Sequence, residues 1–353
     1  MTLLNPCISS VGPRNARIVG VGEAPGEQEE FAGVPFIGPS GQELDRIFEQ
    51  AGLARRDIYL TNVLWTRPPS NKLEAFCVKR AEVPPGYNLP PLSQGKYLHP
   101  DLIPEIERLH AELNDIRPNV IIAFGNTAAW AILGYGGISK IRGSVTESRF
   151  GKVLPTFHPA VLFHGRWDQR PIILADVTKA RAESEFPEIH RPKRFILIDP
   201  TLEEVVSWSE EALNARLLSI DCETKKGTIT ELGFAYSHTE AIVIPFFDRR
   251  KYLPPYLGSY WLREEEIIVR KVIGRVLSSP IPKLFQNGLY DLQYLRREGY
   301  RKIRSCIEDS MILQHSLYPE MPKSLGFLGS IHTNDIAWKN LRPREDEELK
   351  RDD

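Results

Sequence analysis

The stretch Asp221-Cys222-Glu223-Thr224 constrains the fold of this chain more than any other, because it places two carboxylates at the end of an apolar run. Residues 217–220 are largely apolar and predict a buried strand that leads straight into it. Side chains at positions i and i+2 of a strand point to the same face, so Asp221 and Glu223 converge while Cys222 faces the other side. We therefore expect a sheet that carries a carboxylate pair.

A third carboxylate is expected from a helix. Asp291 follows a short apolar strand at residues 284–285 and lies four positions after Asn287. Three carboxylates would hold Mg²⁺ or Mn²⁺ through oxygen ligands. Such a site is typical of two-metal phosphoryl-transfer enzymes, in which the ions activate a water and stabilise the leaving oxygen. The alternative is chance, because neither short pattern is specific when it is taken alone.

The order of the elements around these residues favours an enzyme. Strand-like runs at residues 229–237 and 240–246 and a helix-like stretch at 262–277 precede Asn287. This order resembles the 3′–5′ proofreading exonuclease domain of family A DNA polymerases, which has a ribonuclease H-like mixed sheet. The resemblance continues through residues 308–325 and covers roughly the last 160 residues.

That resemblance implies that Asp221, Glu223 and Asp291 are catalytic metal ligands and that Asn287 positions the DNA strand or Asp291. One motif of the family is missing, however: a Tyr and a final metal-binding Asp should follow the Ser-Leu helix, and residues 332–335 have the wrong spacing. Three explanations stay open. The chain is a fragment of a longer polymerase, another chain supplies the missing part, or the domain is inactive.

Composition limits the class of protein. The 353 residues are 42% hydrophobic, which is enough for two globular domains. The net charge of −1 argues against a generic polycationic nucleic-acid binder but leaves a DNA enzyme open, because carboxylates offset a basic groove. The apolar runs are too short for a bilayer, the start lacks a signal pattern, and the four scattered cysteines indicate neither disulfides nor zinc. We expect a cytoplasmic protein without membrane contact.

Positive charge gathers between residues 140 and 181. A local positive surface there would suit a phosphate backbone, although a solvated face of loops and one helix explains each residue equally well. The basic residues are Lys140, Arg142, Arg149, Lys152, Arg166, Arg170, Lys179 and Arg181.

The first half of the chain alternates strand and helix signals. Strands are predicted at residues 17–22, 58–64, 119–125 and 153–157, with helices from 126 and over 168–185. Ser40 and Glu43 indicate a capping box for a helix that ends at Gly52. Residues 66–100, rich in Pro, Gly and Asn, indicate a long excursion, and loops of that length are usually functional or partly disordered. The alternation predicts an α/β fold with a doubly wound, mainly parallel sheet.

A domain division follows from these patterns. Residues 1–186 are predicted to form the first domain, 187–193 a linker, and 194–353 the exonuclease-like domain. In doubly wound folds ligands bind beyond the carboxyl ends of strands. Two candidate segments lie there, 22–26 and 158–160, and each is weak when taken alone. Segments 33–38, 40–41, 61–63 and 67–69 make the set more specific.

Together these segments resemble the uracil-DNA glycosylase superfamily, particularly its family 4 branch, over residues 17 to 180. The resemblance implies that uracil is flipped from the stack into a pocket. Phe36 would stack on the base and Asn62 would bind its polar edge. His158 would donate a hydrogen bond as charge develops on uracil, and Glu23 would place or activate water.

Leu162 and Phe163 are possible wedges for the vacated stack, with core packing at a helix start as the alternative. Family 4 enzymes hold an iron–sulfur cluster with four cysteines, one of them immediately before the Arg-Pro-Pro segment. Thr66 occupies that position here, and only Cys7 stands where an N-terminal pair would be. We predict no iron–sulfur cluster.

A glycosylase-like domain followed by a proofreading-type exonuclease resembles the N-terminal portion of certain bacteriophage DNA polymerases. The leading interpretation is a DNA replication or repair protein of phage type that acts on DNA in the host cytoplasm, together with a DNA polymerase domain or subunit. The alternative is a non-catalytic DNA-binding adaptor for a polymerase. Retention of the pocket residues favours catalysis, whereas loss of the cysteines and of the last exonuclease motif favours the adaptor.

Overall fold

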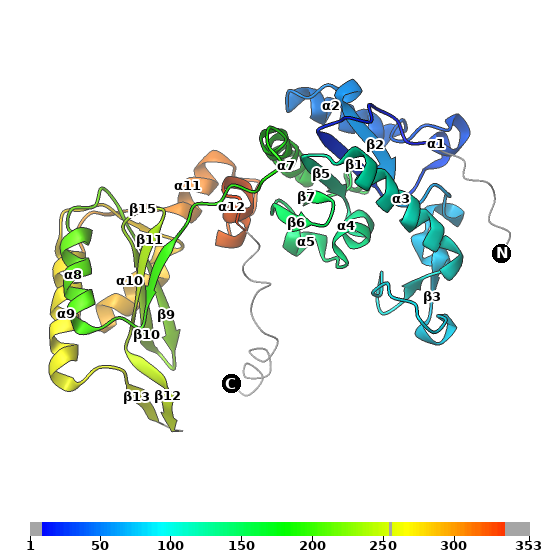
Figure 1. The fold of residues 1–353 in the computed structure, drawn as a ribbon. Coiled ribbons are helices and arrows are strands. Elements are labelled where there is room, and N and C mark those ends of the chain that lie inside the picture. Colours follow the sequence, from blue (N-terminus) through cyan, green and yellow to red (C-terminus); the bar gives the residue numbers. More distant parts are fainter. Residues whose placement is uncertain (1–8, 254–255, 336–353) are drawn as a thin grey trace. The chain divides into compact units, whose positions relative to one another are not determined.

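The computed structural model describes residues 9–253 and 256–335, which divide into two compact units (Figure 1). The described part of the first unit is residues 9–191 and 326–335, and that of the second is residues 192–253 and 256–325. Each unit has a sheet and a buried core of its own. The domain division made from the sequence stays a prediction.

The first unit is built on a five-stranded sheet with the order β2-β1-β5-β7-β6. Strands β1 (Ile18–Gly22), β2 (Ile58–Asn62), β5 (Val120–Phe124) and β7 (Gly151–Thr156) are parallel, and β6 (Thr146–Ser148) is an antiparallel edge. Strands β1, β2 and β5 are buried at every residue, as expected for a parallel sheet covered on both faces. The predicted doubly wound sheet is confirmed.

Helices cover both faces of this sheet (Figure 1). Helices α3 (Ile103–Ile116) and α4 (Asn126–Leu133) pack on one face, and α2 (Pro39–Gln50) and α7 (Arg170–Glu183) pack on the other. The shorter helices are α1 (Glu27–Ala32), α5 (Ile138–Ile141) and α6 (Ala160–Phe163). The predicted excursion at 66–100 contains 3₁₀ turns and a small sheet of β3 (Cys77–Val78) and β4 (Tyr97–Leu98).

Helix α2 begins differently from the prediction. Its N-cap is Gly38, which has extended backbone and no side-chain cap, and Pro39 is the first helical residue. Proline suits this position because its φ is already helical and its missing N–H would have no partner there. Ser40 therefore lies inside the helix, and the Glu43 carboxylate pairs with Arg170 at 2.7 Å. The predicted capping box is wrong.

The second unit has a six-stranded mixed sheet with the order β15-β14-β9-β10-β11-β8. Strands β9, β10 and β11 form an antiparallel meander, and β14 and β15 continue the sheet parallel to β9. This arrangement confirms the predicted ribonuclease H-like sheet. The bounds are β8 (Phe195–Ile198), β9 (Leu218–Lys225), β10 (Thr228–Ala235), β11 (Glu240–Pro245), β14 (Lys283–Phe285) and β15 (Cys306–Asp309).

Helices α8 (Leu202–Ala212) and α9 (Arg263–Ser278) bury their apolar residues in the core of this unit. Helices α10 (Gly288–Arg297) and α11 (Ser310–Leu317) follow strands β14 and β15, and strands β12 (Phe247–Leu253) and β13 (Tyr256–Ser259) pair antiparallel in a small separate sheet. Among the described residues, no helix combines the length and apolarity that crossing a membrane requires.

The C-terminal end of α12 (Leu325–His332) is held on the first unit by a lysine. Lys179 Nζ donates to the carbonyl oxygens of Ser330, at 2.9 Å, and of Thr333, and also to that of Gly143 at 2.7 Å. The last carbonyl groups of a helix carry partial negative charge, so a cation stabilises them. Lys179 thus acts as a C-terminal cap supplied by another element.

The predicted basic surface is not continuous. The side chain of Arg142 is 4% exposed and pairs with Asp176, and that of Lys152 is 1% exposed and pairs with Glu183 at 2.8 Å. Lys179 is engaged by carbonyl groups. Buried charges require such partners, because desolvation without them is costly. The prediction of phosphate contacts is therefore wrong for these three residues.

Replacing Lys179 with Met should release residues 326–335 from the first unit, because three carbonyl groups lose a charged donor. A hydrogen bond to a charged group contributes about 1.5–3 kcal/mol, so amide exchange in this segment should accelerate by about tenfold or more. Hydrogen–deuterium exchange with mass spectrometry measures it. Lys140→Met, at an exposed lysine, is the control, and unchanged protection in Lys179→Met would refute the capping role.

Candidate functional site

A cavity of about 450 Å³ lies at the carboxyl ends of the parallel strands of the first unit. Glu23 follows β1, Asn62 ends β2, and His158 follows β7, while Phe36 comes from the loop between α1 and α2. All four residues, each singled out in the sequence, line this cavity. The fold therefore gathers them at the edge where doubly wound sheets bind their ligands.

Phe36 is held in a strained backbone conformation. Its φ of +54° lies in the left-handed region, which bulky residues rarely adopt. A Cβ on Gly41 would come within 2.1 Å of the Phe36 carbonyl, so only glycine allows this approach. Arg55 Nη1 donates to the Phe36 carbonyl oxygen at 2.9 Å. The Phe36 ring stacks against His158, with centroids 6.1 Å apart and planes inclined by 21°.

Gly22 allows two cavity residues to approach the end of β1. A Cβ at this position would lie 2.3 Å from Asn62 Oδ1 and 2.6 Å from Phe36 Cζ. Asn62 is 4% exposed, and within the described part of the chain its side-chain amide has no hydrogen-bond partner. Its donor and acceptor groups are therefore available to a molecule in the cavity.

His158 is neutral at physiological pH and has a defined tautomer. The backbone N–H of Ala160 donates to its Nδ1 at 3.2 Å, so the proton of the neutral ring lies on Nε2. Burial lowers the pKa of His158 to about 4, although the charge of Glu29 opposes this shift. The ring thus offers an N–H donor without a positive charge.

The pKa of Glu23 is shifted in the opposite direction from that of His158. Burial raises the pKa of its carboxyl, and the charge of Glu74 raises it further, whereas a hydrogen bond from Thr127 lowers it. Thr127 Oγ1 donates to Glu23 Oε2 at 2.5 Å, which leaves the other carboxylate oxygen for a ligand or water. A raised pKa makes the carboxylate a better general base near neutral pH.

Glu29 is a cavity residue that the sequence reasoning missed. It is 8% exposed, and its Oε1 accepts from the N–H groups of Ile37 at 3.0 Å and Gly38 at 2.7 Å. These bonds fix the loop next to Phe36. The sequence feature that could have identified Glu29 was an acidic side chain three positions after Gly26. Other cavity-lining residues that were missed are Asn71, Asn126 and His164, whereas Ser40 lies in the candidate segment 40–41.

The two residues proposed as wedges differ. Leu162 is fully buried in the core that α2 and α7 share with the sheet, so core packing explains it. Phe163 is 48% exposed and makes an edge contact with Trp167, with ring centroids 5.6 Å apart. Only Phe163 has the exposure that a wedge requires.

The carboxylates of the second unit alternate along β9 as predicted. Asp221 and Glu223 are exposed, while Cys222 between them is buried. Asp291, on α10, is 3% exposed, and its Oδ1 accepts from the backbone N–H of Cys222 at 2.9 Å. Partial desolvation raises the pKa of Asp221. Burial raises the pKa of Asp291 too, and the charge of Asp221 adds to this effect.

These three carboxylates are not arranged as a metal site. Over residues 9–253 and 256–335, no three His, Cys, Asp or Glu side chains are grouped so that they could bind an ion. One oxygen of Asp291 is already engaged by an amide, and Asn287 is exposed with a φ of +59°. The residues do not fit Mg²⁺ or Mn²⁺ in this arrangement, so no step is derived through a metal here.

Asp309 connects the elements next to these carboxylates, and its role was missed. Its carboxylate accepts from the N–H groups of Asn287, Gly288 and Met311, at 3.2, 2.7 and 2.8 Å. It thereby caps α11 and fixes the start of α10. The sequence feature that could have identified Asp309 was its place in the motif at residues 308–311.

The first unit is thus a doubly wound α/β domain whose cavity combines an aromatic face, a neutral histidine, an amide and a carboxylate. Residues 9–177 match the uracil DNA glycosylase superfamily. A type-4 uracil-DNA glycosylase of Thermotoga maritima is 35% identical over 175 residues, which are 48% of this chain and 79% of that protein. The chain belongs to the uracil-DNA glycosylase superfamily. The prediction of an enzyme, a hydrolase that acts on DNA, is confirmed.

A further relative extends across both units. A DNA polymerase of Bacillus phage SP01 is 23% identical over 331 residues, or 86% of this chain, which spans 33% of the length of that polymerase. Among solved structures, the catalytic core of RRP6 from Trypanosoma brucei has 16% sequence identity and a TM-score of 0.28, and the match covers 41% of this chain and 36% of that chain.

The His158 ring should titrate near pH 4 and not near 6.5. Between these values the unfolded chain binds the proton and the folded chain does not, so the contribution of His158 to stability is present above pH 6.5 and is lost as the pH falls towards 4. Carbon-13 NMR of the imidazole, assigned with His158→Asn, measures the titration. A midpoint near 6.5 would mean that the ring is not desolvated.

Proposed function

We propose that the first unit recognises uracil in DNA and cleaves its N-glycosidic bond. The observation that carries this proposal is the meeting of Glu23, Phe36, Asn62 and His158 in one cavity, with the His158 proton on Nε2. Family membership supports the same reaction. Because bases inside a duplex cannot reach such a cavity, the uracil must be extruded from the stack.

Three residues would bind the base. Phe36 would cover one face of the ring, and the amide of Asn62, which offers a donor and an acceptor, matches the mixed polar edge of uracil. His158 would donate its Nε2–H to a uracil oxygen. A neutral donor stabilises the negative charge that develops there as the bond breaks, without a proton transfer.

Glu23 would act on the sugar side of the bond. When the C1′–N1 bond breaks, its electron pair leaves with uracil and C1′ becomes positive. The Glu23 carboxylate favours this charge and accepts a proton from the water that adds to C1′. The uracil anion is protonated after it leaves. Burial near Glu74 tunes the carboxylate for this role.

His158→Ala should release uracil from a single-uracil oligonucleotide about 10²–10³-fold more slowly than wild type in single-turnover assays, because an oxyanion-hole-type donor is lost. Glu23→Gln should also be slow, and Glu27→Gln, at an exposed carboxylate of α1, is its matched control. Alkali-revealed breaks on a denaturing gel measure the rate. Activity at the wild-type rate in His158→Ala would contradict the mechanism, and a silent wild type would favour the DNA-binding adaptor.

The pH dependence provides a separate test of Glu23. The wild-type rate should fall on the acid side as Glu23 becomes protonated, at a pH above its ordinary value of 4.5 because burial raises its pKa. His158 stays neutral until about pH 4, so it does not cause this fall. A rate that is constant down to pH 4 would exclude Glu23 as a base.

We infer a second function for the other unit, 3′–5′ exonuclease activity next to a DNA polymerase. The observations that favour it are the ribonuclease H-like strand order and the exposed pair Asp221 and Glu223 beside Asp291. Similarity to a phage DNA polymerase over 86% of the chain supports a partner of that kind and a role in DNA replication or repair.

Asp221→Asn should abolish the shortening of a 5′-labelled oligonucleotide from its 3′ end, because the exposed carboxylate pair on β9 loses one of its charges. Glu203→Gln, at an exposed carboxylate of α8, should have no effect. Denaturing gels with and without EDTA measure both. Shortening that persists in Asp221→Asn would place the nuclease site elsewhere.

A further inference from the structure

At its carboxyl end, strand β2 has no neighbouring strand of the sheet on its outer side. It is an edge strand, and on its outer side the carbonyl of Leu60 accepts from the N–H of Val11 at 3.0 Å. Asn62 comes two residues later, at the strand end, where an unpaired edge would leave its orientation poorly fixed. Its amide is nevertheless one of the groups that line the cavity.

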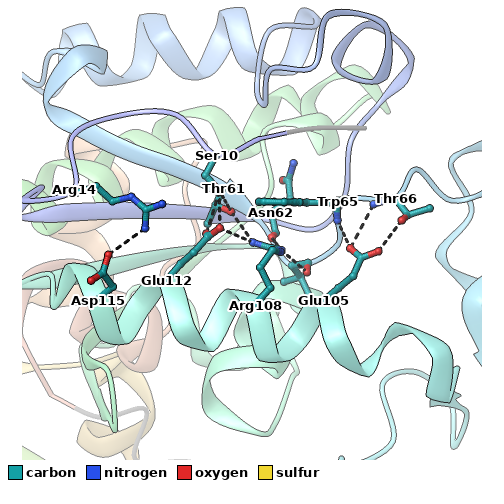
Figure 2. A network of polar contacts seen from close by, with 11 residues as sticks. Ser10, Arg14, Thr61, Asn62, Trp65, Thr66, Glu105, Arg108, Glu112 and Asp115 are labelled. Atoms are coloured by element: carbon teal, nitrogen blue, oxygen red, sulfur yellow. Dashed lines mark hydrogen bonds and ion pairs between the residues drawn. The ribbon is translucent and has the colours of Figure 1, made fainter. Parts of the chain in front are cut away.

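At the end of β2, the guanidinium group of Arg108 makes the hydrogen bonds that a neighbouring strand would otherwise make. Arg108 Nη2, from helix α3, donates to the carbonyl oxygens of Asn62 at 2.7 Å and Val63 at 3.0 Å (Figure 2). Its Nη1 donates to Thr61 Oγ1 at 3.3 Å. Three consecutive residues at the strand end are thus bound by one rigid, planar group.

Arg108 is itself held from two sides. Glu112 pairs with its Nη1 at 3.1 Å, and the Trp65 ring lies 4.2 Å from the guanidinium. Ser10 Oγ donates to Glu112 at 3.0 Å and lies within hydrogen-bond distance of Thr61 Oγ1, at 2.8 Å, which closes the network drawn in Figure 2. Side chains with so few alternative positions hold the Asn62 backbone at a fixed place.

The same turn also reaches the other side of the cavity. The N–H of Val63 donates to the Gly22 carbonyl at 2.9 Å, and that of Leu64 donates to the Glu23 carbonyl at 3.0 Å. The backbone that Arg108 holds therefore supports both Asn62 and Glu23, although Arg108 does not line the cavity.

We propose that Arg108 is a positioning residue that sets the orientation of the Asn62 amide and thereby the recognition of the base. The role as stated rests on the proposed uracil excision. Lysine cannot replace arginine here, because a single ammonium does not present the planar fork that contacts two successive carbonyl groups and a hydroxyl.

A double-mutant cycle tests this role. Arg108→Met should slow single-turnover uracil release about tenfold or more, and Arg108→Lys should restore little of the rate. If Arg108 acts through Asn62, the same substitution in an Asn62→Ala background should change the rate less than about threefold. An equal slowing in both backgrounds would refute the proposal, because it would show that Arg108 acts through something other than Asn62, such as the Glu23 backbone or the stability of the fold. Thermal unfolding of each variant checks that it folds.

Arg14→Met is the matched control. Arg14 lies in the same network, but its ion pair with Asp115, at 3.1 Å, is exposed and does not touch residues 61–65. It should release uracil at the wild-type rate.

A readout that needs no excision separates this proposal from the proposed function. The side-chain amide signals of Asn62 in nitrogen-15 NMR, assigned with Asn62→Ala, should shift or broaden in Arg108→Met and stay unchanged in Arg14→Met. Unchanged signals in Arg108→Met would overturn the positioning role. A wild type that releases no uracil but whose Asn62 signals respond to Arg108→Met would instead overturn only the proposed reaction.

Discussion

The parallel pairing of β1 with its two neighbours is the constraint on which the cavity of the first unit depends. It sets Gly22 directly opposite Asn62 and brings the end of β5 alongside. Since a Cβ at Gly22 would collide with Asn62 and Phe36, the register and the glycine together determine how closely these side chains meet. The rest of the site is arranged around that junction, with His158 from the end of β7 against the Phe36 ring.

Desolvation gives the two titratable residues of this cavity opposite properties. Burial keeps His158 neutral and raises the pKa of Glu23, so one becomes an uncharged donor and the other a stronger base. Both effects favour chemistry in which negative charge leaves on one side of a bond and a water is deprotonated on the other. In the second unit, burial raises the pKa of Asp291 and the charge of Asp221 adds to this effect, but among the described residues these carboxylates do not form a group of ion ligands.

Much of the fold could be predicted from local patterns, and the errors have physical causes. The strands of both sheets follow from apolar runs, and the alternation of Asp221, Cys222 and Glu223 follows from the two-residue period of a strand. The capping box failed because Pro39 competes successfully for the first helical position. The prediction of a basic surface failed because the number of basic residues does not tell which of them are buried. Arg142, for example, is buried and pairs with an internal carboxylate.

The sequence by itself determined the α/β class, the strand ends that carry functional groups, and the identity of Glu23, Phe36, Asn62 and His158 as candidates, because short motifs and periodicity are local properties. Only the tertiary structure decided what surrounds them. Arg108 contacts the Asn62 carbonyl across 46 residues of sequence, and Lys179 caps a helix 151 residues away. Burial, and with it the pKa of His158, arises from the packing of separate elements, so no local pattern contains it.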